Sequence, residues 1–134
     1  MARGWDRGRL RDLSHRLVRL HKTLLDFERG AYEAAYGPVR SSGELLDLLL
    51  NHEQFLWLRS LSGVMARIDE AIDDPEAGEP DVERFFRETS GLLRSGRGGM
   101  FESRYHAALQ ASPEVVMAHA DVVKLLPVKE SDHA

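Results

Sequence analysis

The chain has 134 residues, no cysteine, and 22 acidic against 18 basic side chains, which gives a formal net charge of −4. This length suits one domain with a self-supporting core. The lack of cysteine excludes disulfides and thiolate metal sites, and the net acidity argues against non-specific binding of nucleic acid. The most apolar run, LLDLLL, is short and contains Asp47, and no signal-peptide stretch follows the basic N-terminus. We therefore expect a soluble cytoplasmic protein without membrane contact.

A long first helix is predicted from about Trp5 to Tyr36, because apolar residues recur there at alternating spacings of three and four. The helix should stop at Gly37-Pro38, since glycine can adopt a left-handed cap and proline cannot continue the hydrogen-bond ladder. A heptad repeat of this kind indicates packing against a partner helix, in a bundle or across a dimer. The seam consists of Leu10, Leu13, Leu17, Leu20, Leu24, Phe27, Ala31 and Ala34.

The second helix should begin after Ser41, which has capping-box spacing to Glu44, and should end at about Asp74. A weaker copy of the same cap at Asn51 predicts a break there, with a short helix ahead of a longer one. The acidic segment 75–80, PEAGEP, reads as a loop because it is rich in helix breakers.

Three further helices are expected at about 81–94, 100–111 and 113–126, with a flexible glycine-rich connection at 95–99 and an N-cap at Ser112. The pattern predicts an all-α, antiparallel bundle of four to five helices that forms a single domain over 1–134, with a frayed tail at 127–134. The residues predicted to face inward are Val82, Phe85, Phe86, Thr89 and Leu93 in the first of these helices, and Phe101, Tyr105 and Ala108 in the second.

The second helix is apolar nearly all the way round in two places, LLDLLL and FLWL. Four consecutive residues cover roughly 300° of a helix at ~100° per residue, so FLWL cannot face a single neighbour. Either this helix is central to the bundle, or another subunit buries part of its surface, and both readings can hold together. The residues predicted for such an interface are Leu45, Leu49, Phe55, Leu56, Trp57 and Leu58.

Six histidines in a helical chain raise the possibility of a metal site, because bundles bind metals with His and carboxylates from facing helices. The Glu-x-x-His pattern of ferritin-like sites is absent. The best candidate ligands are His21 and Glu28, two turns apart on the first helix, with His119 on the inner face of the last helix. A histidine on an apolar face is more often hydrogen-bonded in the core, so we expect no cofactor and keep the metal site as an alternative.

Residues 1–22 carry seven basic and two acidic side chains, a net charge of +5, which leaves −9 for the rest of the chain. The basic residues spread around the helix opposite the leucine seam, as on a solvated face, and no aromatic residues interleave with them as in nucleic-acid binding. An acidic protein partner for this basic segment is at least as plausible as nucleic acid, and the acidic remainder of a second copy of the chain is one such partner. Four carboxylates between residues 69 and 74 oppose the negative end of the second helix, which predicts a cationic neighbour such as the arginine-rich first helix.

Residues 20–75 carry the segments LLDFERGAYEAAYGPV, ELLDLLL and FLWLRSLSGVMARIDEAID. In these segments the chain resembles a group of small bacterial proteins of unknown function. The resemblance covers somewhat less than half of the chain. It implies a small cytoplasmic bacterial helical protein, and it implies no activity, cofactor or catalytic residue.

Sequence motifs give no positive support for an enzyme. The serines lie in no nucleophile pattern, and the glycine-rich stretch GRGGM lacks the lysine of a phosphate-binding loop. We therefore expect a non-enzymatic protein–protein interaction or regulatory module that acts as a homo-oligomer, in the simplest case a homodimer, with a further unidentified protein partner left open. The alternative is a bundle that binds a metal ion or small ligand between its helices.

Overall fold

The computed structural model describes residues 4–94 and 99–127. Within these ranges the chain is helical and contains no strand, which confirms the predicted all-α class. The helices in chain order are α1 (Gly4–Tyr36), α2 (Ser42–Asn51), α3 (Glu53–Leu56), α4 (Arg59–Asp73), α5 (Glu79–Arg94), α6 (Met100–Ala111) and α7 (Pro113–Val123).

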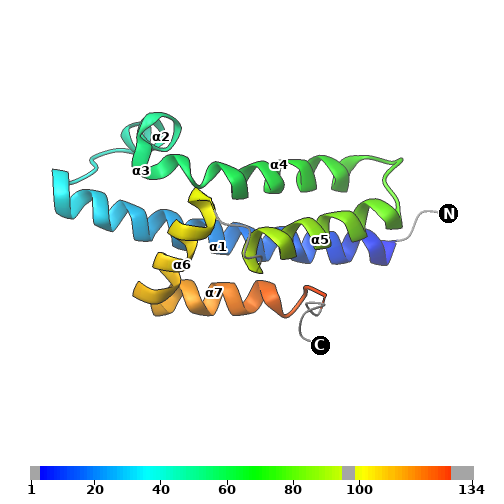
Figure 1. Cartoon of the computed structure of the whole chain (residues 1–134). Coiled ribbons are helices and arrows are strands. Elements are labelled where there is room, and N and C mark those ends of the chain that lie inside the picture. Colours follow the sequence, from blue (N-terminus) through cyan, green and yellow to red (C-terminus); the bar gives the residue numbers. More distant parts are fainter. Residues whose placement is uncertain (1–3, 95–98, 128–134) are drawn as a thin grey trace.

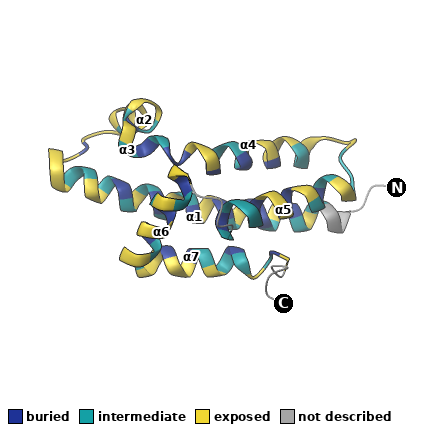
Figure 2. Ribbon diagram, in the orientation of Figure 1, coloured by how far each residue is buried: buried dark blue, intermediate teal, exposed yellow. Residues whose placement is uncertain are grey.

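The long helix α1 is the axis of the bundle (Figure 1). It packs against α7 on one side and against α3, α4 and α5 on the other. Helices α4 and α7 run antiparallel to α1, α6 crosses between the layers, and α2 lies apart at one end. Buried residues follow the inner faces of these helices (Figure 2). None of the described helices is long and apolar enough to cross a membrane.

The leucine seam of α1 is buried over only part of its predicted length. From Leu10 to Leu24 its leucines are at most 1% exposed, whereas Phe27 is partly buried and both Ala31 and Ala34 are exposed. Glu28 occupies the core position that follows Leu24. A 3.5-residue repeat drifts by about 20° per heptad on a straight helix of 3.6 residues per turn. The seam beyond Phe27 is therefore turned away from the core, which corrects the prediction of one continuous packed stripe.

Local signals set most helix ends as predicted. Gly37 has a φ of 102°, and its amide donates to the Glu33 carbonyl at 2.9 Å. Ser41 Oγ accepts the Glu44 amide at 3.0 Å, and Ser112 Oγ accepts the Val115 amide at 3.3 Å. The break predicted near Asn51 falls at His52, and a turn at Trp57 and Leu58 separates α3 from α4. Helix α5 starts two residues before its predicted position and α7 ends three residues earlier. Of the predicted flexible connection at 95–99, the structure describes only Gly99. Of the predicted frayed tail at 127–134, it describes only Pro127.

Arg7 on α1 supplies the cation predicted for the acidic end of α4. Its guanidinium donates to the carbonyls of Ala71, Ile72 and Asp74 at 3.4, 2.7 and 2.7 Å. These are carbonyls that a helix end leaves without intrahelical partners. Arg7 thus binds the backbone at the negative end of α4, where a positive charge is favourable.

Candidate interaction surface

Helix α2 lies at the edge of the bundle and exposes most of its leucines. It packs mainly against α3 (Figure 1), and Leu48 is its one buried residue. Leu45 and Leu49 are partly buried against the core, whereas Leu46 is 55% and Leu50 is 50% exposed. A ten-residue helix with this composition is ordinarily covered on more than one side. We call these four residues, Leu45, Leu46, Leu49 and Leu50, the leucine surface.

His52 holds α2 at an angle to α3. Its backbone is extended, with ψ 131°, and its Nδ1 accepts the Gln54 amide at 3.1 Å. The imidazole ring lies 5.2 Å from the ring of Tyr32, 5.9 Å from that of Tyr36 and 6.2 Å from that of Phe55. These ring contacts hold His52, which is the hinge between α2 and α3, against the C-terminal end of α1. The orientation of α2 therefore depends on one aromatic cluster at its end.

The backbone at the end of α2 is also anchored. The Arg59 guanidinium donates to the Leu50 carbonyl at 2.6 Å, and the His52 amide donates to the Leu48 carbonyl at 2.8 Å. Two carbonyls that would otherwise face solvent at the helix end are thus satisfied. The leucine surface is consequently presented on a defined helix and not on a loop.

The structure divides the six residues predicted for an interface into two groups. Phe55, Trp57 and Leu58 are at most 3% exposed and belong to the core of the single chain. The second helix is central at this point, and these three side chains offer no surface to a partner. Leu56 is partly buried, as are the two predicted leucines of α2. The sequence prediction omitted Leu46 and Leu50, although both lie in LLDLLL, because the pattern does not show which leucine of this run the core takes.

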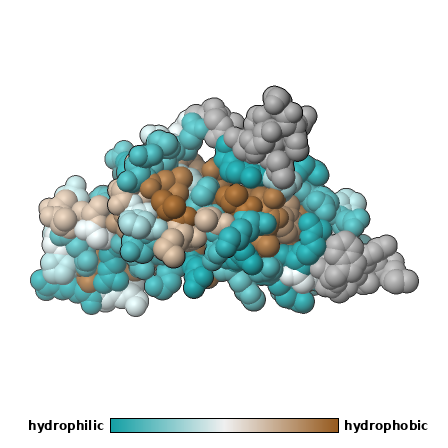
Figure 3. Space-filling model, turned by 90° about the horizontal axis from the view of Figure 1, so that it is seen from below, coloured by the Kyte–Doolittle hydropathy of each residue, from teal (hydrophilic) through white to brown (hydrophobic). Residues whose placement is uncertain are grey.

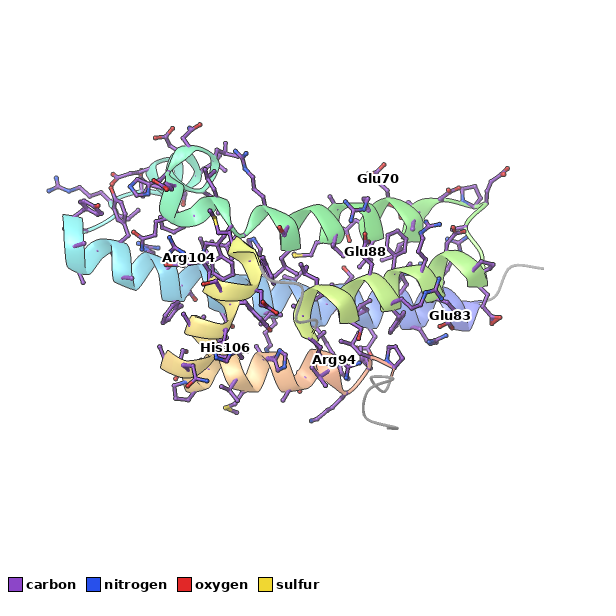
Figure 4. The ribbon with its side chains drawn as sticks, in the orientation of Figure 1. Glu70, Glu83, Glu88, Arg94, Arg104 and His106 are labelled. Atoms are coloured by element: carbon purple, nitrogen blue, oxygen red, sulfur yellow. The ribbon has the colours of Figure 1, made fainter. Side chains whose placement is uncertain are left out.

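Glu28 is buried, and its carboxylate accepts hydrogen bonds from two side chains of the protein. Its Oε2 accepts the indole Nε1–H of Trp57 at 2.6 Å, and its Oε1 accepts Gln54 Nε2 at 3.2 Å. Arg104 lies where α6 crosses α1 (Figure 4), with Nη1 at 4.0 Å from Oε2. Gln54 Nε2 also donates to the Glu28 backbone carbonyl at 3.2 Å. The carboxylate thus joins α1 to the α3–α4 junction and to α6.

The two other predicted ligands lie in separate surroundings. His119 Nδ1 forms a 2.7 Å hydrogen bond with the hydroxyl of Tyr105, and burial raises the pKa of that tyrosine. Burial also lowers the pKa of His119, as does the positive charge of Arg94 at the end of α5 (Figure 4). No group of three or more His, Asp or Glu side chains that could hold a metal occurs in residues 4–94 and 99–127. The structure therefore does not assemble the predicted site from His21, Glu28 and His119.

His21 is partly buried, and its Nε2 atom is buried without a hydrogen-bond partner, the one such side-chain atom in the described part of the chain. Burial lowers its pKa below the ordinary value of 6.5. The unfolded chain then binds this proton more readily than the folded chain. The histidine accordingly contributes stability that is present above pH 6.5 and is lost as the pH falls below 6.5 toward the lowered pKa.

We expect His21→Leu to raise the free energy of unfolding by about 1 kcal/mol at neutral pH, because it removes an unsatisfied buried nitrogen. The variant should also lose less stability than the wild type between about pH 7.5 and pH 5.5. Urea denaturation followed by circular dichroism at both pH values measures this. His15→Leu, at an exposed position of α1, is the control. An unchanged pH dependence in the His21 variant would contradict the assignment.

Three basic residues of α1 bind groups on other helices of the chain. Arg9 pairs with Glu83 of α5 at 3.1 Å, and Arg19 pairs with Asp121 of α7 at 3.2 Å. Arg16 Nη1 donates to the backbone carbonyl of Asp121 at 2.7 Å. These partly exposed pairs each contribute little to stability, but they connect α1 to the helices on both of its sides. The first helix is a structural axis whose charges are partly matched inside the molecule.

Charged residues border the leucine surface. Glu44 and Asp47 on α2 and Glu53 on α3 are all exposed. An apolar centre with a charged rim is the arrangement of protein interaction sites.

No family model, no curated protein and no solved structure matches this chain.

Proposed function

We propose that the protein is a non-enzymatic interaction module that associates with a second copy of itself through the leucine surface. The observation that carries this proposal is the half-exposure of Leu46 and Leu50 on a helix that is capped at its start and anchored at its end. Exposed apolar clusters on a small protein are typical of interaction sites. The resemblance of residues 20–75 to small bacterial proteins supports a cytoplasmic bacterial setting.

The geometry favours a reversible dimer. Packing α2 against α2 of a second copy covers Leu46 and Leu50 of both chains at once, because the same patch is used twice across a two-fold axis. Burial of apolar surface yields roughly 25 cal/mol per Å². The leucine surface belongs to one ten-residue helix, which is small beside the ~800 Å² per partner of a standard stable interface. Self-association should therefore depend on protein concentration.

The test is the mass of the untagged protein in solution as a function of concentration. We expect the wild type to shift from monomer to dimer in sedimentation velocity and native mass spectrometry. The variant Leu46→Glu/Leu50→Glu should remain a monomer with unchanged helicity, because both side chains already contact solvent. Val18→Glu, at a position 51% exposed on the outer side of α1, should dimerise like the wild type. A monomeric wild type at about 1 mM, or a dimeric double variant, would overturn the proposal.

A further inference from the structure

The cap at the start of α3 is a histidine ring nitrogen. Nδ1 of His52 accepts the backbone N–H of Gln54 at 3.1 Å, so this atom holds a lone pair and the proton of the neutral ring is on Nε2. Helices are more commonly capped by a side-chain oxygen, as Ser41 and Ser112 cap α2 and α7. A serine hydroxyl does not gain a proton near neutral pH, whereas an imidazole does. The cap of α3 is therefore sensitive to pH.

Protonation and capping compete for the same lone pair of His52. A second proton on the imidazole binds to Nδ1, where it meets the amide hydrogen of Gln54. The charged ring has only donors, so it cannot accept this bond in any orientation. The ring then turns away from the amide, and it leaves the contacts that hold it against Tyr32 and Tyr36 on α1. Acid thus releases both restraints on the hinge between α2 and α3.

The side of α1 that faces the hinge supplies no free carboxylate to hold a charged ring. The ionisable side chains of α1 in contact with the imidazole are those of Tyr32 and Tyr36, at 5.2 and 5.9 Å between ring centroids. Glu33 of the same helix accepts the Val39 amide at 2.7 Å and pairs with Arg29 at 3.5 Å. This carboxylate is therefore already bound to other groups.

The charged groups of the other helices at the hinge are also bound or exposed. Asp47 of α2 accepts the side-chain amide of Asn51 at 2.8 Å, and Arg59 of α4 donates to the Leu50 carbonyl at 2.6 Å. Glu53 of α3 is exposed. In the described part of the chain no carboxylate forms an ion pair with the imidazole. Protonation therefore exchanges a hydrogen bond for a charge without an ionic partner.

We propose that protonation of His52 releases the hinge between α2 and α3 and thereby weakens self-association through the leucine surface. This inference rests on the proposed function and adds the regulation of the same surface. Leu46 and Leu50 meet their counterparts on a second copy only while α2 keeps its angle to the bundle. Because a two-fold dimer uses the hinge of both chains, the loss of orientation acts twice.

The test compares the dissociation constant of the dimer at about pH 7.5 and about pH 5.5 in sedimentation velocity. For the wild type the constant should rise by about tenfold at the lower pH, with unchanged helicity in circular dichroism. The general effect of charge has the opposite sign. Protonation of the six histidines reduces the magnitude of the formal net charge of −4, which lessens repulsion between copies. Dissociation in acid is therefore specific to the hinge.

His52→Asn is the decisive variant, because asparagine is a good N-cap that does not titrate. Its dissociation constant should change by less than about twofold between the two pH values. The comparison is the ratio within each variant, so the loss of the ring contacts cancels. His15→Asn makes the same substitution at an exposed position of α1 and should keep the ratio of the wild type. An unchanged constant in the wild type, or equal ratios for His52→Asn and the wild type, would overturn the proposal.

A second apolar area allows a further control. Apolar residues also gather on the side of the molecule that carries α7 (Figure 3), where Met117 is 71% exposed. Met117→Glu should dimerise with the pH dependence of the wild type, because the hinge and the leucine surface are unchanged. Loss of that pH dependence in Met117→Glu would place the sensitive contact on α7 and would contradict the assignment to His52.

The Gln54 amide reports on the hinge without a dimer. In the monomeric variant Leu46→Glu/Leu50→Glu, the protection factor of this amide in hydrogen exchange followed by NMR should fall by about fivefold at the lower pH. Adding His52→Asn to that variant should abolish the fall. A Gln54 amide that does not respond would overturn the switch even if the dimer forms. A wild type that stays monomeric would overturn the proposed function even if the amide responds, so the two failures are distinguishable.

Discussion

Trp57→Ala is expected to lower the free energy of unfolding by about 3 to 5 kcal/mol. The indole ring is 3% exposed, lies 5.3 Å from the ring of Phe101 on α6, and donates its Nε1–H to Glu28 at 2.6 Å. Truncation leaves a cavity where α1, α6 and the α3–α4 junction meet, and it leaves a buried carboxylate with weaker partners. Both effects act in the same direction.

The measurement for Trp57 is urea denaturation followed by circular dichroism, since the substitution removes a fluorophore. Trp57→Phe retains an aromatic ring and loses only the indole N–H, so it should cost less, about 1 to 3 kcal/mol. Running each variant at two protein concentrations distinguishes a core role from an interfacial one. A urea midpoint that changes only with protein concentration would show that the ring does not belong to the core of the single chain. A Trp57→Ala variant as stable as the wild type would show the same.

The helix ends were predictable because they depend on short-range chemistry. Gly37 ends α1 through a left-handed backbone, and the hydroxyls of Ser41 and Ser112 cap α2 and α7. Each signal involves residues within four positions of one another, so the sequence contains the whole interaction. The end of α4 was predictable for a different reason. The repulsion of carboxylates near a negative helix end requires a cation, and Arg7 supplies it from 64 to 67 positions away.

The interaction surface was only partly predictable, because local patterns do not specify which side of an apolar helix the core takes. LLDLLL and FLWL look alike as sequence. The structure buries Phe55 and Leu58 under α1 but leaves Leu46 and Leu50 outside, since the His52 hinge turns α2 away from the bundle. The role of Glu28 could not be predicted from the sequence either, because its shortest hydrogen bond is to a residue 29 positions away. Buried carboxylates in helical chains invite a metal hypothesis, and only the three-dimensional arrangement shows hydrogen-bond donors in place of further ligands.

Glu28→Ala is the second substitution with a large expected effect, a loss of about 3 kcal/mol in the free energy of unfolding. Removing the carboxylate leaves the indole N–H of Trp57 buried without an acceptor, and it frees Gln54 from its side-chain partner. The pair with Arg104 adds little, because that side chain is 42% exposed and solvent screens the charge. Glu28→Gln keeps one acceptor oxygen and should cost about half as much.

A double-mutant cycle separates the hydrogen bond from the general loss of packing. Combining Glu28→Ala with Trp57→Phe removes acceptor and donor together, so the double variant should be more stable than the sum of the two losses predicts, by about 1.5 kcal/mol or more. The same cycle with Arg104→Ala in place of the tryptophan variant should give a coupling below about 1 kcal/mol. If the losses in the free energy of unfolding of the Glu28 and Trp57 variants were strictly additive, the two side chains would contribute to stability independently, and the hydrogen bond between them would not matter. Strong coupling instead identifies this hydrogen bond as the link that holds the α3–α4 junction, and with it the base of the leucine surface, on α1.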